Sequence, residues 1–116
     1  ASRPDTTLHF ETRGGSIYAN GVQFFIKGVV WFGSEARNGP PEGLKASRTV
    51  AEIIRFVANR RFNTLRLLFN AEDAIEDRII SAGVPPELEG LRYLEMFRYI
   101  AKAAAKAGLL VVVTLQ

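Results

Sequence analysis

Arg66 is the residue of this sequence whose chemistry points most directly to a ligand. It lies within Phe62–Phe69, a mostly apolar run of strand length. Burying a guanidinium is costly unless a carboxylate or a bound ligand meets its planar fork of N–H donors. Arg66 therefore indicates either such a partner at the end of a strand, or a side chain that reaches past the strand into solvent. The residues alone leave both interpretations open.

A second apolar run, Ile26–Glu35, also ends in aromatic and polar side chains. Trp31 and Glu35 stand where a strand would pass into a loop. Strands of parallel sheets are buried on both faces and read as continuous apolar runs, and sites are built at their carboxyl ends. The two runs together predict one rim of a site in a parallel α/β fold.

The remaining candidate groups are interpreted as structural or solvated. Glu72, Asp73, Glu76 and Asp77 are interpreted as solvated and not as catalysts, because they fall in a long predicted loop where runs of charge usually face water. His9 is the single histidine and lies in a predicted hairpin. The absence of cysteine excludes disulfides and thiolate sites in this sequence. We therefore expect no transition-metal site and no cofactor.

The net charge of +3 does not by itself predict a nucleic-acid partner. The basic side chains are expected on the solvent faces of two helices, where Glu52 and Glu95 alternate with them: Arg55, Arg60, Arg61, Arg92, Arg98, Lys102 and Lys106. This pattern favours a solvated surface over a phosphate-binding track. No apolar run approaches the ~18 residues of a membrane helix. The polar opening residues 1–5 are not a signal peptide, which a processed secreted protein would also lack.

Residues 1–24 predict an N-terminal extension and a small antiparallel hairpin. Asn20-Gly21 separates two strand-like runs, and Arg13-Gly14-Gly15 is an earlier turn signal. Asn-Gly between such runs is typical of a two-residue hairpin turn.

Residues 25–116 predict strands alternating with helices. The expected strands are 25–31, 64–69 and 109–114, and the expected helices are 49–61 and 91–106. Thr49 and Glu52 form a capping-box pattern, Asn63 suits a left-handed residue after the first helix, and Gly108 ends the second. The expected buried stripe of the second helix comprises Leu91, Leu94, Phe97, Ala101, Ala104 and Ala105. Residues 70–90 are expected to form a long loop with room for a short helix.

This β-α-β-α-β order predicts a parallel sheet that is incomplete on its own. Two helices cover one face of three strands, yet the strands are apolar on both faces, and both outer strands offer unpaired edges. Closure into a (β/α)8 barrel of about 250 residues would satisfy both faces and both edges. A doubly wound sheet usually carries G-x-G-x-x-G after its first strand. The segment Trp31–Glu35 has no such motif.

The segments Gly28–Glu35, Phe62–Phe69 and Leu91–Val113 resemble the N-terminal third of family 5 glycoside hydrolases, which include cellulases and other endoglycanases. The most specific part is Asn63-Thr64-Leu65-Arg66-Leu67, and the resemblance covers roughly residues 8–116. It implies an N-terminal hairpin and the first three β/α units of a TIM barrel, a retaining mechanism, a carbohydrate substrate and secretion. It also implies a catalytic glutamate pair at strands four and seven, beyond these residues.

The resemblance implies roles for four residues. Arg66 would support the nucleophilic carboxylate, and it is the catalytic-site residue predicted in this chain. Trp31 would either stack on a sugar or pack in the core. Glu35 would fix its loop by accepting a hydrogen bond at the substrate-binding rim, and Gln116 would take the place of a histidine that ends strand three.

Three residues depart from the family pattern. Val30 replaces an asparagine, Lys45 replaces a sugar-stacking tryptophan, and Gln116 replaces the histidine. Together with the missing glutamates, they motivate an alternative hypothesis. In this alternative, the protein is a non-catalytic carbohydrate-binding or structural α/β module.

Overall fold

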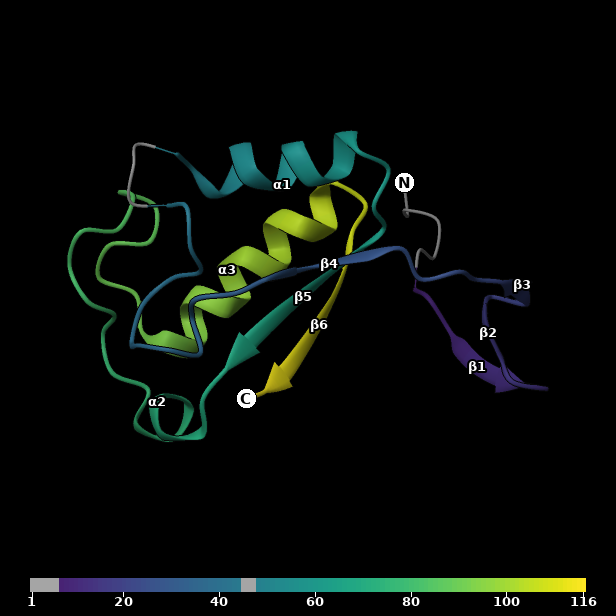
Figure 1. Ribbon diagram of the computed structural model, residues 1–116, viewed down its shortest axis with the longest axis horizontal. Helices are drawn as coiled ribbons and strands as arrows, with labels where there is room; N and C mark the ends of the chain where they lie inside the picture. The colour runs from purple at the N-terminus through teal and green to yellow at the C-terminus, as the bar shows by residue number, and fades with distance from the viewer. Residues whose placement is uncertain (1–6, 45–47) are drawn as a thin grey trace, which may run out of the picture.

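The computed structural model describes residues 7–44 and 48–116, which form two small sheets and three helices (Figure 1). The first sheet is antiparallel, in the order β1 (Phe10–Arg13), β2 (Ser16–Ala19), β3 (Val22–Gln23). The second is parallel, in the order β4 (Gly28–Trp31), β5 (Thr64–Phe69), β6 (Leu110–Leu115). The helices are α1 (Val50–Asn59), α2 (Ala71–Glu76) and α3 (Tyr93–Lys106). The chain thus has a mixed α/β fold.

The N-terminal sheet is held together by two glycine-containing turns. Gly14 and Gly15 have φ of 55° and 82°, and Asn20 and Gly21 have φ of 49° and 81°. Positive φ at both central residues matches the twist of the flanking strands in a two-residue hairpin loop. The Asn-Gly turn is confirmed, and the glycine pair adds a second turn, so that this region has three strands instead of a single hairpin.

The first parallel strand is shorter than predicted, because β4 begins at Gly28 and not at Phe25. The segment that precedes β4 forms hydrogen bonds with the Asn63 side chain instead of pairing with β5. The Asn63 Oδ1 accepts the Lys27 N–H at 2.8 Å, and its Nδ2 donates to the Phe25 carbonyl at 2.8 Å. Asn63 was expected in the left-handed conformation, but that φ belongs to Arg61, at 64°. The other two strands lie within one residue of their predicted bounds.

Helices α1 and α3 pack on the same face of the parallel sheet (Figure 1). The Thr49 hydroxyl caps α1 by accepting the Glu52 N–H at 3.1 Å, as its pattern predicts. The Glu95 carboxylate accepts the Arg92 N–H at 3.0 Å where α3 begins, and Gly108 follows the end of α3 with φ of 79°. The buried residues of α3 are Tyr93, Met96, Phe97, Ile100 and Ala104.

The predicted stripe of α3 was partly wrong, because its phase is shifted by about one residue. Phe97 and Ala104 are buried as expected, whereas Leu94 is 47% exposed. The true stripe includes Tyr93, whose hydroxyl makes it look polar in a periodicity pattern. The long segment between β5 and α3 contains α2, the short helix for which the sequence left room.

The sheet face opposite the helices is open at its centre in the described part of the chain, whereas Thr64 and Leu68 on the same face of β5 are buried. Val30 and Val112 on this face are 43% and 42% exposed. Two helices therefore cover one face, as the sequence predicts, whereas the number of barrel units stays a prediction. Within residues 7–44 and 48–116, no helix is long and apolar enough to cross a membrane.

Candidate functional site

Arg66 lies at the centre of the open sheet face. Its strand neighbours in register are Val30 on β4 and Val112 on β6. Because side chains alternate along a strand, the three share one face. Arg66 is exposed, and its Nε donates to the Thr114 hydroxyl at 3.1 Å. Among the described residues it forms no ion pair, so most of its guanidinium donors remain available to a ligand or to further chain.

Trp31 lies on the opposite face, against the helices. It pairs in register with Leu67, and the two belong to the same buried cluster. The indole is 8% exposed, and its Nε1 donates to the Glu42 carbonyl at 2.7 Å. The structure thus places Trp31 in the core, which is the alternative the sequence left open. A sugar bound over Arg66 would not reach this ring without crossing the sheet.

Phe32 is the exposed aromatic residue at this rim, and the sequence analysis missed it. It directly follows β4, is 59% exposed, and accepts the Glu42 N–H at its carbonyl at 2.8 Å. By alternation it continues the face of Val30 and Arg66. Neighbouring residues of a strand point to opposite faces of the sheet. The sequence could therefore have indicated Phe32 as the exposed ring once Trp31 was assigned to the core.

Glu35 fixes the loop after β4, as expected from the sequence. Its Oε1 accepts the Gly33 N–H at 2.6 Å. Gly33 itself has φ of 122°, and a Cβ there would lie 2.7 Å from the Glu42 backbone nitrogen. Only glycine fits this close approach between two backbone segments. The loop conformation therefore depends on both residues.

A buried hydrogen-bond network joins the loop after β4 to the end of β5 and to α3. The Ser34 hydroxyl donates to the Leu68 carbonyl at 2.6 Å, and the Tyr93 hydroxyl donates to the Ser34 carbonyl at 2.6 Å. The Asn70 N–H in turn donates to the Tyr93 oxygen at 3.3 Å. The side chains of Ser34 and Tyr93 are inaccessible to solvent. No local sequence signal predicts this network, because its partners are far apart in the chain.

The electrostatics of this network favour a neutral phenol. Burial raises the pKa of Tyr93 above its ordinary value of 10.0, and the nearby Asp73 and Glu35 carboxylates raise it further. The Asn70 backbone N–H acts in the opposite direction, because it would stabilise the phenolate. Tyr93 therefore remains a hydrogen-bond donor throughout the neutral range.

The acidic cluster has structural contacts, so its expected role as a purely solvated charge run was partly wrong. Asp73 is 7% exposed, and its Oδ2 accepts from Asn70 Nδ2 at 2.6 Å. The Asp77 carboxylate accepts the Leu94 N–H at 2.9 Å near the start of α3. Glu76 pairs with Arg78 at 2.8 Å. These contacts fix α2 and the start of α3 and give no sign of a catalytic pair.

The other predicted residues are placed as follows. The Gln116 N–H donates to the Phe69 carbonyl at 2.9 Å, so that Gln116 ends the parallel sheet with an exposed side chain. The His9 N–H donates to the Asn20 side chain at 2.8 Å, in the N-terminal sheet. Lys45 lies outside the described residues. Within the described ranges, no group of three or more metal-ligating side chains occurs.

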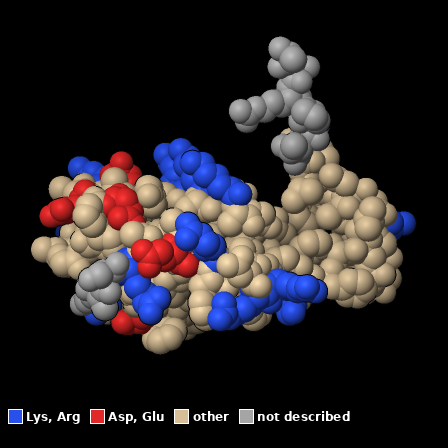
Figure 2. All heavy atoms as spheres, turned by 90° about the horizontal axis from the view of Figure 1, so that it is seen from above, with Lys and Arg blue, Asp and Glu red and all other residues tan. Residues whose placement is uncertain are grey.

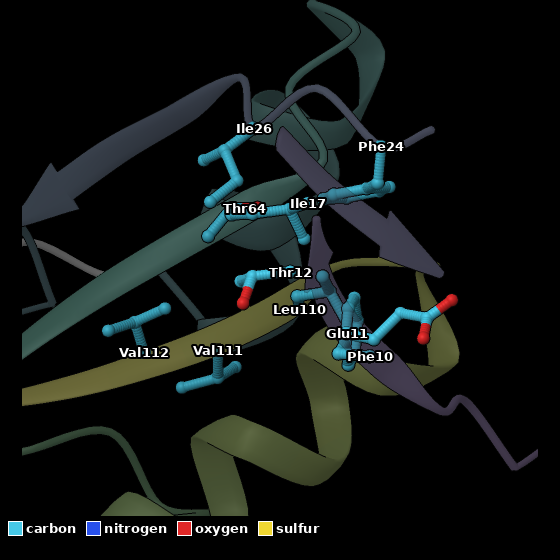
Figure 3. Close-up of a pocket in the computed structure, with 10 residues that line it drawn as sticks. All are labelled: Phe10, Glu11, Thr12, Ile17, Phe24, Ile26, Thr64, Leu110, Val111 and Val112. Carbon is cyan, nitrogen blue, oxygen red and sulfur yellow. The ribbon is translucent and has the colours of Figure 1, made fainter. Parts of the chain in front are cut away.

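A hollow lies between the N-terminal sheet and the open face of the parallel sheet, nearer the amino ends of its strands (Figure 3), and Val112 is one of the residues that line it. It has a volume of about 470 Å³ and is lined mainly by apolar side chains, including Phe10, Ile17 and Ile26 against Leu110. Glu11 is its one charged lining residue among those described. Ligands of parallel α/β folds bind at the carboxyl ends of the strands, whereas Thr64 and Leu110 in the lining of this hollow lie at the amino ends of β5 and β6.

The face of the molecule in Figure 2 shows no single basic track among the described residues. Figure 2 shows Lys and Arg side chains in separate groups, with Asp and Glu side chains between several of them. Arg37 pairs with Glu42 at 2.8 Å, and Arg13 approaches Glu11 at 3.4 Å. This distribution agrees with the solvated surface that the sequence favours.

The two small sheets and the helices packed on one face of the parallel sheet define a mixed α/β fold, and several solved structures that are similar to it are cellulases. A hyperthermostable endocellulase matches 96% of this chain at 28% identity with a TM-score of 0.80. An endocellulase of Pyrococcus horikoshii, in complex with cellotetraose, matches 96% at 25% identity and a TM-score of 0.78. A cellulase–inhibitor complex matches 91% at 26% identity and a TM-score of 0.78.

These matches confirm the resemblance to the N-terminal segment of a cellulase-like glycoside hydrolase. The chain spans about a third of the matched proteins, at 32%, 32% and 30% of their lengths. No protein-family model matches the sequence. No curated protein matches it either.

Proposed function

We propose that this chain is the N-terminal part of a secreted, retaining family 5 glycoside hydrolase that cleaves O-glycosidic bonds in a β-linked polysaccharide or oligosaccharide. The observation that carries the proposal is the open sheet face with Arg66 at its centre, in a chain that matches about a third of an endocellulase. An exposed guanidinium on an apolar face is stabilised once a carboxylate meets its fork.

In this proposal, further chain completes a (β/α)8 barrel. Additional strands pair with the edge of β6 and cover Val30 and Val112, which removes the exposed apolar surface. Those strands also supply two glutamates about 5–5.5 Å apart, one the nucleophile and one the acid/base. Arg66 holds the nucleophile in its ionised form, because a neighbouring cation lowers the pKa of a carboxyl group.

The residues of this chain form one side of the cleft. Phe32 offers an exposed ring at the rim, and Gln116 offers an amide that hydrogen-bonds sugar hydroxyls. Glu35 fixes the loop that carries Phe32. Trp31 supports the rim from the core side of the sheet. No cofactor is needed, because the two glutamates carry out both steps.

The test is an assay of the protein that carries this chain together with the rest of the barrel. Soluble β-glucans are incubated with it, and proton NMR follows the anomeric configuration of the first product. Hydrolysis with retention is the expected result. Inversion would overturn the retaining mechanism, and calorimetric binding of oligosaccharides without any turnover would favour the non-catalytic binding module.

A further inference from the structure

Tyr93 has a buried hydroxyl that core packing does not require. Its ring packs edge-on against Phe97 with ring centroids 5.0 Å apart, and phenylalanine would fill the same space. The hydroxyl must therefore compensate its desolvation through hydrogen bonds. It does so twice, by donating to the Ser34 carbonyl and by accepting the Asn70 N–H. Both partners belong to the connections that follow the parallel strands.

The loop after β4 is held from several sides. Ser34 donates its hydroxyl to the Leu68 carbonyl, two residues beyond Arg66 on the same strand. The Glu35 carbonyl accepts from Asn70 Nδ2 at 3.0 Å. Phe32, the exposed ring of the rim, immediately precedes this clamped segment. A buried, fully paired polar network of this kind specifies one conformation.

We propose that Tyr93 is a positioning residue for the candidate cleft: through Ser34 and Asn70 it fixes the loop that presents Phe32 to the substrate. The proposal rests on the proposed function, because it assigns Tyr93 a role in sugar hydrolysis. Tyr93 itself is buried and does not touch the substrate. Tyr93 acts by holding the loop in place. Small displacements of a side chain that contacts the substrate can lower the reaction rate strongly.

The experiment compares Tyr93→Phe with Tyr99→Phe in the complete protein. Tyr99 lies on the same helix but is 39% exposed, which makes it a matched control. We expect Tyr93→Phe to lower kcat/KM about tenfold, which corresponds to about 1.4 kcal/mol, and Tyr99→Phe to keep the wild-type value. Both are assayed well below the Tm measured for each variant, so that the folded fraction is equal.

A double-mutant cycle separates positioning from simple stabilisation. If Tyr93 acts through the loop, its loss in kcat/KM is reduced in a Phe32→Ala background, because the group being positioned is gone. Additive losses in kcat/KM, or a Tyr93→Phe variant as active as Tyr99→Phe, would overturn the proposal. If Tyr93→Phe fails to fold, Ser34→Ala takes its place in the same cycle, with the same expected non-additivity.

A further readout does not depend on activity. Amide hydrogen exchange at residues 33–36 and at Asn70 should accelerate in Tyr93→Phe and not in Tyr99→Phe, since the anchoring hydroxyl is lost. Unchanged exchange would overturn the positioning role. An inactive wild-type protein whose exchange still responds in this way would instead refute the glycosidase function and leave the loop anchor standing.

Discussion

The two faces of the parallel sheet differ most clearly at its centre, around Leu67 on one side and Arg66 on the other. On the helix face, Leu65 and Leu67 are 1% and 0% exposed and belong to one continuous core. On the opposite face, Val30 and Val112 are 43% and 42% exposed and flank the charged Arg66. The first face stabilises this part of the molecule. The second face has exposed apolar side chains at its centre and is covered only in part: Leu68 is 6% exposed, and Val112 lines the hollow beside the N-terminal sheet.

The largest expected effect tests whether the helix face is the stabilising one. Leu67→Ala should lower the free energy of unfolding by about 2–5 kcal/mol, because it removes buried methyl groups and leaves a cavity. Chemical denaturation of the complete protein measures this loss. Val112→Ala provides the comparison. If it costs as little as about 0.5 kcal/mol, as at a surface site, the second face is open in the complete protein and the proposed barrel closure is contradicted.

The next effect addresses the chemistry of the open face. If the complete protein is the proposed glycosidase, Arg66→Ala should lower its turnover by about 10²-fold, the scale of losing an electrostatic contact to the reacting centre. Steady-state kinetics with a soluble β-glucan measure it. Arg66→Lys is the matched variant, since it keeps the charge and loses the bidentate fork. Wild-type turnover in Arg66→Ala would show that Arg66 only covers apolar surface.

A smaller change, in KM, should show whether the Phe32 ring stacks on a sugar or packs against the rest of the protein. Phe32→Leu should raise KM about tenfold, which corresponds to about 1.4 kcal/mol, if the ring stacks on a sugar, because leucine lacks the flat aromatic face that packs against the C–H groups of a sugar ring. Phe32→Trp should keep a KM near that of the wild type, since it retains an aromatic face. Equal KM values for the Leu and Trp variants would mean that the rest of the chain simply covers this position.

Sequence patterns predicted the elements of this chain better than the directions of its side chains. The Asn20-Gly21 turn, the Thr49 cap and the strand Thr64–Phe69 follow from local signals. Alternate side chains of a strand point to opposite faces of the sheet, so Trp31 and Phe32 must lie on different faces. In a continuous apolar run, however, the sequence does not show which of the two side chains points to the core. Phe32 was missed for this reason.

The buried network was beyond prediction for a different reason. Ser34 and Tyr93 are 59 residues apart in the chain, and their hydrogen bond forms only once α3 packs beside the loop after β4. Serine in a glycine-rich loop and tyrosine at the start of a helix are common in unrelated contexts. Only tertiary packing reveals that the Tyr93 hydroxyl bonds to both Ser34 and Asn70, in the two loops that follow β4 and β5. These two hydrogen bonds are the basis of the smallest effect that we expect.

That effect is the alkaline dependence of stability. Because the folded-state pKa of Tyr93 is raised above its ordinary value of 10.0, the folded protein keeps the phenolic proton where the unfolded chain loses it. The contribution of Tyr93 to the free energy of unfolding is therefore complete below about pH 10 and is lost as pH rises through the folded-state pKa. Denaturation of wild type and Tyr93→Phe from pH 7 to 11 should give a constant difference that narrows above pH 10. A difference that widens there would contradict a neutral, buried phenol and with it the hydrogen bond that anchors the rim of the open face.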